Sequence, residues 1–571
     1  MLKELIAFVL IAAVGVSPFA YSDDIDPDTV DYSTYTWVAV EMSFVSTKRY
    51  QNPLMDCDFD VVFTSPCGEK YKMPGFWDGG YDWRVRFAPT SSGVWKYQTV
   101  SSDPDNGLHG LTGTLAANPY TGNLPIYKHG FVRTQPDIRY FMYADGTPFF
   151  YLGDTNWNMP QQPIDSSNHP EIDSMFKYLL DRRVEQGFTV YQSQPIGTDS
   201  SWGAGGIVEH NVEDFRDMDR RFRYIAEKGF VHANSQLVWA KMPTWMPWFN
   251  DKKLLDKVCR HWVARYAAYP VMWTTAQESD PDHYGHFADY NPWLFVAERI
   301  NYHDPYNHPL TAHQENMTFQ SVPVPVFTSP IYRSAFEKLP PHSWHAVQWH
   351  TETHREQRYE ELKHLWYRGG GKPVVNFEGR YENLWTNNFG ARVQGWTAFL
   401  NGMFGHGYGS IDIWLYNSTY DVDTTTVVDG GTIVTTPEDK DVKWYVSINF
   451  PTRIELGHHM RGFFESFEWW KLVPCFDEGI YFTPASDSSF YAVSTIGTEL
   501  YTAYFYNRNA DAGTFHALEQ NRTYTAQWFS PRTGEYTLID SNISGTGERV
   551  SWTIPDKPDD LDWVVLMTMN E

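Results

Sequence analysis

The sequence predicts a mixed α/β protein, a (β/α)8 TIM barrel flanked by an amino-terminal and a carboxyl-terminal antiparallel β-sandwich. Its 571 residues exceed the roughly 250–300 that one hydrophobic core serves, so several domains are expected. Residues 32–130 and 479–571 alternate apolar and polar side chains, which is typical of strands with one solvated face. Between residues 139 and 476, short apolar runs alternate with helical segments, which favours a parallel sheet.

Residues 1–22 are typical of a secretory signal peptide. Lys3 precedes an apolar stretch, and Ala20 and Ser22 supply small residues for a cleavage site. The apolar stretch is shorter than the roughly 20 residues that a membrane-spanning helix needs. We therefore expect a secreted or periplasmic protein without a permanent membrane span.

The amino-terminal sandwich is expected over residues 32–130. Residues 36–41 and 83–87 alternate in polarity, and turn residues follow at 52–53, 78–79 and 92–93. This pattern predicts antiparallel strands joined by tight turns.

The barrel is expected over residues 139–476. Its eight predicted strands cover residues 148–153, 188–193, 231–238, 271–277, 310–313, 346–349, 373–377 and 402–408. Helices are predicted at 170–186, 212–228, 252–268, 292–303, 356–368 and 391–400. A doubly wound open sheet is the alternative, but no glycine-rich phosphate-binding turn follows the first strand, where residues 153–157 read Gly-Asp-Thr-Asn-Trp.

The last third of the chain is predicted to change structure twice. Residues 421–441 are rich in Thr, Val and Asp, which indicates a surface insertion or hairpin, and residues 444–476 favour helix. Strand-like runs then return at 501–506, 523–529 and 563–567, so a second sandwich is expected over residues 479–571.

Composition narrows the ligand class. A formal charge of −25 argues against nucleic acid as the main partner, and an aromatic content of 17% suits the flat faces of sugar rings as well as sandwich cores. The four cysteines are too few for a disulfide framework. Cys57 and Cys67 are not expected to pair, because a strand between them would hold their Cα atoms more than about 7 Å apart.

Two glutamates end apolar runs in matching positions. Glu278 closes the fourth predicted strand and Glu378 the seventh, and the carboxyl ends of barrel strands meet at one mouth. A pair of opposed carboxylates is the minimum equipment for hydrolysing a glycosidic bond, so both are predicted to be catalytic. The alternative is that each is a helix cap or a surface residue. Glu382 competes with Glu378 for the nucleophile's role, but Glu378 ends the apolar run directly.

Other polar and aromatic residues at predicted strand ends are expected to bind the substrate. They are Asp154, Trp157, Gln192, Gln194, His313, Gln348, His350, Arg380, Tyr381, Glu382, Arg392, His406 and Tyr408.

Several of these residues carry a specific expectation. Asp154 either binds a sugar hydroxyl or caps a turn, and Trp157 is predicted to stack on a sugar. His406 and Tyr408 are expected to orient Glu378, although a buried histidine satisfied by the backbone is an alternative.

The basic residues near the seventh strand suggest how Glu378 stays charged. Arg380 or Arg392 is predicted to hold its carboxyl ionised, as a nucleophile requires.

A metal or cofactor is not expected. Asp280, Asp282, His283 and His286 suggest a metal site at first sight, but they lack the His-Glu-x-x-His spacing of zinc hydrolases. The sequence also lacks the Gly-x-Ser-x-Gly elbow of esterases.

Several segments carry motifs that are specific in combination. They are residues 139–157, with its Gly-Asp-Thr-x-Trp, then 267–273, 304–310, 372–382, with its Glu-x-x-Tyr-Glu, 391–396, 405–409 and 528–534. Together these segments resemble the apiosidase-like glycoside hydrolases. Residues 74–80 also resemble the β-sandwich that precedes the catalytic barrel of many bacterial polysaccharide-degrading enzymes, and the carboxyl-terminal sandwich resembles the collagen-binding type.

The resemblance implies a retaining barrel hydrolase. Its general acid/base would be Glu278, at the end of strand four, and its nucleophile Glu378, at the end of strand seven. Apiosidases carry aspartate where this chain has Glu278, so their substrate geometry does not transfer. The amino-terminal sandwich favours an extended polysaccharide substrate.

Two other functions remain open at this point. One is a non-catalytic carbohydrate-binding or adhesion protein on a degenerate barrel, and the other is a polysaccharide lyase, which needs a base placed to take the proton α to a uronate. The sugar, its linkage, endo or exo action and the oligomeric state are left open by the sequence.

Overall fold

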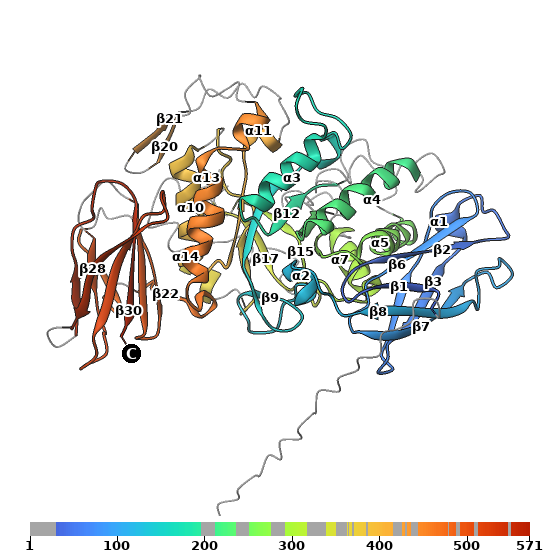
Figure 1. Cartoon of the computed structure of the whole chain (residues 1–571), viewed down its shortest axis with the longest axis horizontal. Helices are drawn as coiled ribbons and strands as arrows, with labels where there is room; N and C mark the ends of the chain where they lie inside the picture. Colours follow the sequence, from blue (N-terminus) through green and yellow to red (C-terminus); the bar gives the residue numbers. More distant parts are fainter. Residues whose placement is uncertain are drawn as a thin grey trace, which may run out of the picture.

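A computed structural model places three parts in a row, with the barrel between the two sandwiches (Figure 1). The structure describes residues 30–195, 212–235, 251–275, 292–316, 339–349, 362–363, 365–367, 370–383, 386–414, 425–428, 431–434, 443–477, 479–486, 491–506, 512–545 and 550–570. No helix in these ranges is long and apolar enough to cross a membrane.

The central sheet confirms the predicted barrel. Its strands follow the order β15-β14-β13-β12-β11-β19-β18-β17-β16, and every neighbouring pair is parallel. The strands are β11 Tyr151–Asn156, β12 Val190–Ser193, β13 Val231–Ser235, β14 Val271–Thr274, β15 Leu310–Thr311, β16 His313–Asn316, β17 His345–Gln348, β18 Val374–Asn376 and β19 Gly405–Tyr408. Ala312 separates β15 from β16, so these two short strands share the position of the fifth predicted strand and nearly close the ring.

The first barrel strand begins later than the sequence predicts. Residues Pro148–Phe149 form β10, which pairs with β9 (Phe141–Met142) in a separate antiparallel hairpin. Strand β11 then continues to Asn156, so Asp154 lies inside the strand instead of after it.

Helices pack outside the barrel, and three of them begin at a residue whose side chain caps the helix. Ser174, Asp251 and Asn387 each accept backbone N–H bonds at the start of a helix. The short helix α2 Pro125–Lys128 precedes the barrel, whose helices and turns are η2 Met159–Gln161, α3 Met175–Glu185, α4 Val212–Glu227, α5 Lys252–Tyr266, α7 Pro292–His303 and α10 Asn388–Leu400. The helix predicted at 356–368 lies largely outside the described residues.

Small residues on β19 leave space for large side chains inside the barrel. A Cβ on Gly407 would lie 2.6 Å from Gln192 Oε1 and would overlap the carbonyl oxygen of Phe377. Gln192 fills this space and donates to that carbonyl at 2.6 Å, while the Tyr151 hydroxyl donates to Gln192 at 3.3 Å. The barrel interior is therefore a packed core below its mouth.

The amino-terminal part is the predicted sandwich. One sheet has the order β1-β8-β7-β3-β4 and the other β2-β6-β5, and the β1–β8 pair is parallel where an antiparallel pair was expected. The elements are β1 Tyr32–Tyr35, β2 Val40–Val45, α1 Pro53–Asp56, β3 Phe59–Thr64, β4 Lys70–Pro74, β5 Phe76–Trp77, β6 Asp82–Phe87, β7 Gly93–Ser101 and β8 Thr112–Asn118.

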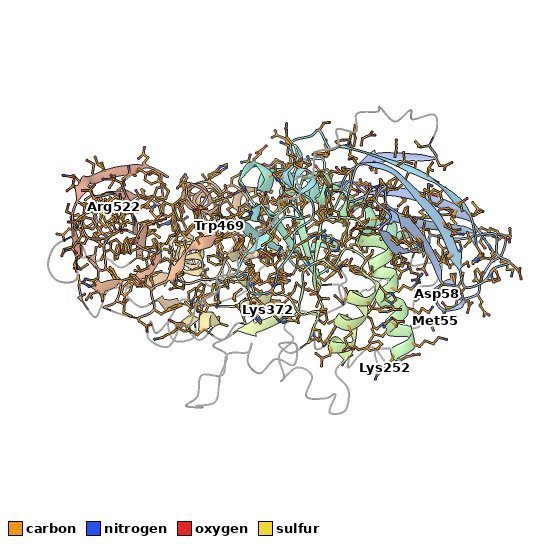
Figure 2. The ribbon with its side chains drawn as sticks, turned by 90° about the horizontal axis from the view of Figure 1, so that it is seen from below. Met55, Asp58, Lys252, Lys372, Trp469 and Arg522 are labelled. Carbon is orange, nitrogen blue, oxygen red and sulfur yellow. The ribbon has the colours of Figure 1, made fainter. Side chains whose placement is uncertain are left out.

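Buried ion pairs join this sandwich to helices α4 and α5. Arg86 of β6 lies 2.6 Å from Asp219, and Arg265 lies 2.7 Å from Asp78, with both arginines nearly inaccessible to solvent. Figure 2 shows Met55 and Asp58 at the same end of the molecule as Lys252, the first residue of α5, with Arg522 at the opposite end.

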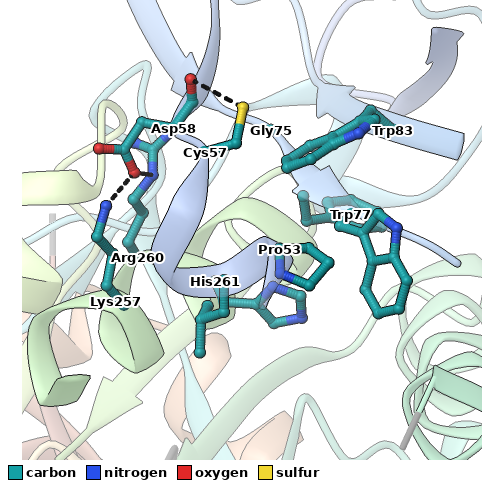
Figure 3. A pocket seen from close by; sticks show the side chains of 11 residues that line it. Pro53, Cys57, Asp58, Gly75, Trp77, Trp83, Lys257, Arg260 and His261 are labelled. Carbon is teal, nitrogen blue, oxygen red and sulfur yellow. Dashed lines mark hydrogen bonds and ion pairs between the residues drawn. The ribbon is translucent and has the colours of Figure 1, made fainter. Parts of the chain in front are cut away.

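A small cavity lies in this contact, between α1, β5 and α5. Its lining includes Trp77, Trp83 and Pro53, with the Lys257–Asp58 ion pair at its edge (Figure 3). The cavity measures about 20 Å³, which suffices for a water molecule and is far too small for a sugar ring.

The chain after β19 crosses to the second sandwich through short helices. The predicted insertion contains a hairpin, β20 Thr425–Val428 with β21 Gly431–Val434. The helical elements are α11 Ile411–Trp414, α12 Trp444–Ser447, α13 Pro451–Ile454, the π-helical η7 Glu455–Met460, α14 Arg461–Glu465 and η8 Trp469–Lys471. Helices α10, α13 and α14 stand between the barrel strands and the carboxyl-terminal sandwich (Figure 1).

The carboxyl-terminal part is the second predicted sandwich. Its sheets have the orders β22-β24-β25-β30-β27-β28 and β23-β26-β29. The strands are β22 Val473–Pro474, β23 Phe482–Pro484, β24 Tyr491–Ile496, β25 Leu500–Phe505, β26 Gly513–Phe515, β27 Tyr524–Phe529, β28 Tyr536–Ile543, β29 Trp552–Ile554 and β30 Trp563–Met569. One sheet packs on α10, where Trp396 stacks on Tyr504 with ring centroids 5.6 Å apart.

Candidate active site

The carboxylate of Glu378 lies two residues beyond β18 and is surrounded by hydrogen-bond donors. Trp157 Nε1 donates to Oε1 at 3.2 Å, the Tyr381 hydroxyl donates to the same oxygen, and Gln348 Nε2 donates to Oε2 at 2.9 Å. These donors follow or end the first, sixth and seventh barrel strands, so the fold brings together residues more than 200 positions apart. The side chain of Glu378 keeps 10% of its surface exposed.

A fourth residue, His313, completes this group from the fifth strand position. Its Nε2 lies 3.4 Å from Glu378 Oε2, and its ring stacks on Trp157 with centroids 5.7 Å apart. Burial lowers the pKa of His313 to about 3, so the ring is neutral near pH 7 and the contact is not an ion pair there. Glu378 thus meets neutral groups from four strand positions. We call Trp157, His313, Gln348 and Tyr381 the Glu378 shell.

Trp157 makes a different contact from the one predicted. It is only 3% exposed, and its indole N–H donates to Glu378 and, at 2.6 Å, to the Tyr381 hydroxyl. A ring so buried offers little surface to a sugar, so in this structure Trp157 shapes the surroundings of Glu378 instead.

The alternative nucleophile, Glu382, points away from this group. Its carboxylate is 2% exposed as a residue and accepts bonds from Tyr408 at 2.5 Å, Thr452 at 2.8 Å and Arg453 at 2.9 Å. Both oxygens are therefore occupied by protein groups from β19 and α13. This geometry favours Glu378 over Glu382 as the group that meets a substrate.

Strand alternation moves three predicted mouth residues to the helix side of the sheet. Asp154 pairs in register with Tyr408, and Asp154 forms an ion pair with Arg183 of α3 at 2.9 Å. His406, one pleat before Tyr408, is buried near Gly395 of α10, and its Nδ1 lies 3.4 Å from Asn376. These contacts differ from the predicted ones. Asp154 pairs with an arginine instead of capping a turn or meeting a sugar, and His406 and Tyr408 contact groups other than Glu378.

Three further residues predicted to bind the substrate, Gln192, Gln194 and Arg392, lie in different parts of the structure. Gln192 is fully buried in the barrel core, while Gln194 is half-buried after β12. Arg392 binds Asp562 of the carboxyl-terminal sandwich at 2.7 Å, so its guanidinium is engaged there and not at Glu378 as predicted.

Arg380, the other basic residue predicted to hold Glu378 ionised, directly precedes Tyr381 in the chain. Its backbone N–H donates to Gln394 at 2.7 Å, and burial lowers the pKa of its guanidinium to about 10, which leaves it charged near pH 7.

Some predicted residues lie outside the part that the structure describes. These are Glu278, His350 and the acidic and histidine residues between positions 280 and 286. Within the described ranges, no group of three or more metal-ligating side chains is gathered at one point.

Sequence reasoning missed the groups that hold Glu382. Thr452 and Arg453 come from a short helix about 70 positions further along the chain, and no spacing or motif around them marks this contact. A buried arginine needs a carboxylate partner, but the sequence does not show that Arg453 is buried.

A family model described as "Apiosidase-like, catalytic domain" matches residues 135–471, which is more than half of the chain. The chain belongs to the apiosidase-like family. A domain of unknown function, DUF5060, matches residues 33–102, and a model described as "Putative collagen-binding domain of a collagenase" matches residues 478–568. No curated protein matched the chain.

Solved structures with the same architecture are similar along most of this apiosidase-like chain. One, described as a "putative glycoside hydrolase" from Bacteroides vulgatus ATCC 8482, has 16% identity and a TM-score of 0.64, covering 94% of this chain and 100% of its own. Another, a glycoside hydrolase family 5 protein from the same organism, has 16% identity and a TM-score of 0.58, covering 79% and 94%. At these identities the likeness establishes the shared barrel fold alone.

Proposed function

We propose that this protein is a secreted glycoside hydrolase that cleaves a polysaccharide or oligosaccharide by a retaining mechanism. Glu378 is the nucleophile and Glu278 the general acid/base. The observation that supports this most is the Glu378 shell, because donors fixed around one carboxylate hold it in a single orientation at the carboxyl end of a barrel strand. Membership of the apiosidase-like family supplies the reaction class.

The reaction proceeds in two displacements. A carboxylate oxygen of Glu378 attacks the anomeric carbon while the bond to the leaving oxygen breaks, and Glu278 gives its proton to that oxygen. A glycosyl–Glu378 ester results. Glu278, now a carboxylate, takes a proton from water, and the water oxygen attacks the same carbon and releases Glu378.

The Glu378 shell has a separate task at each step. Donation from Trp157, Gln348 and Tyr381 stabilises the free carboxylate before attack and again when the ester is cleaved. Because Gln348 and Tyr381 bind different oxygens of Glu378, they also restrict rotation of the carboxylate. This restriction keeps an oxygen directed at the anomeric carbon.

The experiment compares wild type with Glu378→Ala on a panel of plant and microbial polysaccharides, with products identified by mass spectrometry. Turnover should fall by at least about 10³-fold, since the covalent step is lost. Azide should restore turnover of an activated aryl glycoside and give a glycosyl azide of inverted configuration. Activity within tenfold of wild type would rule out Glu378 as the nucleophile.

The same panel separates the other functions. Binding without turnover by both proteins would identify a carbohydrate-binding or adhesion protein. Products that absorb in the ultraviolet through a new double bond would identify a lyase.

A further inference from the structure

Glu382 is buried four residues beyond Glu378 and has no place in the two displacements. It is held on three sides, by Arg453 and Thr452 of α13 and by Tyr408 of β19. Arg453 itself is fully buried, so the pair is shielded from solvent and salt. A buried pair of this kind is costly to assemble and is weak evidence for stability alone.

The backbone of Glu382 is fixed as firmly as its side chain. Its N–H donates to the carbonyl of Gly409 at 3.0 Å, and its own carbonyl accepts from Ile411 at 3.2 Å. Glu382 therefore pins the loop after β18 to the segment after β19. The residue next to this anchor is Tyr381.

The Tyr381 ring occupies space left open by a glycine. A Cβ on Gly409 would overlap the Tyr381 ring, so only glycine lets the ring lie there. From this position the phenol reaches both the Glu378 carboxylate and the Trp157 indole. Gly409 thus packs against one side of the ring, and Glu382, the residue after Tyr381, fixes the backbone from which the Tyr381 side chain projects.

We propose that Glu382 is a positioning residue that acts through Tyr381, with its Arg453 ion pair holding the Tyr381 hydroxyl against Glu378. The inference rests on the proposed role of Glu378. It assigns to α13, outside the barrel, the support of a donor to the nucleophile. Loosening of the anchor lets the phenol move, and the nucleophile loses one of its fixed donors.

A double-mutant cycle tests this assignment on the aryl glycoside that wild type hydrolyses. Tyr381→Phe should lower kcat by about 10- to 100-fold, the value of a hydrogen bond to a charged group. Glu382→Gln should lower kcat by about tenfold with little change in KM, because Gln loses the ion pair with Arg453 while it keeps neutral bonds to its partners. Added to Tyr381→Phe, Glu382→Gln should have almost no further effect.

Asp219→Asn is the matched control. Asp219 is also a buried carboxylate held by two arginines, but it lies in the contact between α4 and the amino-terminal sandwich. Its loss should lower the melting temperature as much as Glu382→Gln does and leave kcat unchanged. Thr452→Val, which removes one bond to Glu382, provides a milder variant should Glu382→Gln fold poorly.

Crystal structures of Glu382→Gln and Asp219→Asn give a readout that needs no activity. The Tyr381 hydroxyl should leave Glu378 in the first and stay in the second. An unmoved hydroxyl, or kcat losses that multiply in the double variant, would overturn the inference. Retained activity in Glu378→Ala would instead overturn the proposed function, so the two failures are distinct.

Discussion

Neutral histidines buried within the barrel make its stability sensitive to acid. His406 of β19 is 2% exposed and faces α10, and burial lowers the pKa of its ring to about 3 from an ordinary value near 6.5. Between these values the unfolded chain binds a proton that the folded protein does not. Stability is therefore full above pH 6.5 and falls as the pH decreases toward 3.

The variant His406→Gln should reduce this acid sensitivity. From pH 7 to pH 5, the wild-type ring costs about 2 kcal/mol of unfolding free energy, at about 1.4 kcal/mol per pH unit below 6.5. Urea unfolding at both pH values measures the difference for each protein. If the free energy of unfolding fell equally in wild type and variant, His406 would have the same pKa in the folded and the unfolded protein.

At the scale of elements, inward-facing glycines on β19 determine which side chains fill the barrel. Gly407→Ala should destabilise the protein by about 1–3 kcal/mol, because the new Cβ meets the backbone carbonyl of Phe377, which cannot rotate away. Gly462→Ala is the matched control, since Gly462 lies in α14 with nothing within 4 Å of an added Cβ. It should stabilise by about 0.5–1 kcal/mol. Urea unfolding of both variants tests the contrast, and similar effects would contradict it.

The strands themselves were readable from the sequence, whereas the faces of their side chains were not. Each of the eight predicted runs overlaps a barrel strand, because burial on both faces leaves continuous apolar sequence, although the first strand begins three residues later than predicted. However, side chains alternate with a period of two, so an error of a few residues at a strand end can assign a residue to the wrong face. Asp154 was misplaced for this reason, since β11 runs to Asn156 and Asp154 lies within it, facing the helices. The end of β19 at Tyr408 was predicted correctly, but the sequence did not show that this last residue faces the helices.

Four other residues predicted to bind the substrate lie together, although only Trp157 and Gln348 lie directly at the carboxyl end of a strand. Substrate binding by these residues stays a prediction. Trp157, His313, Gln348 and Tyr381 were all expected near the mouth, and the structure gathers them around Glu378. Their individual contacts were not predictable, because the donors come from strands that are distant in sequence. Similarly, Arg392 carries no local sign that its partner is Asp562, 170 positions away.

At the scale of the whole molecule, one hydrophobic cluster reaches all three parts, while the interior of the second sandwich forms a separate cluster. The same cluster of buried side chains includes Trp95 of the first sandwich, Trp262 of the barrel and Tyr504 of the second sandwich. Buried ion pairs cross both contacts, Arg86 with Asp219 on one side and Arg392 with Asp562 on the other. We therefore expect the three parts to unfold together, because the shared cluster and the ion pairs across both contacts make their unfolding cooperative.

Asp562→Ala tests this cooperativity. It leaves the 3% exposed Arg392 without its main carboxylate partner and removes the acceptor of the Tyr504 hydroxyl, so stability should fall by about 3–5 kcal/mol. Glu468→Ala breaks an exposed pair with Lys471 and should leave the free energy of unfolding nearly unchanged. Urea unfolding followed by tryptophan fluorescence should show a single transition at lower urea for Asp562→Ala. A separate early transition confined to the second sandwich would show that the sandwich unfolds independently and that the shared cluster does not couple it to the barrel.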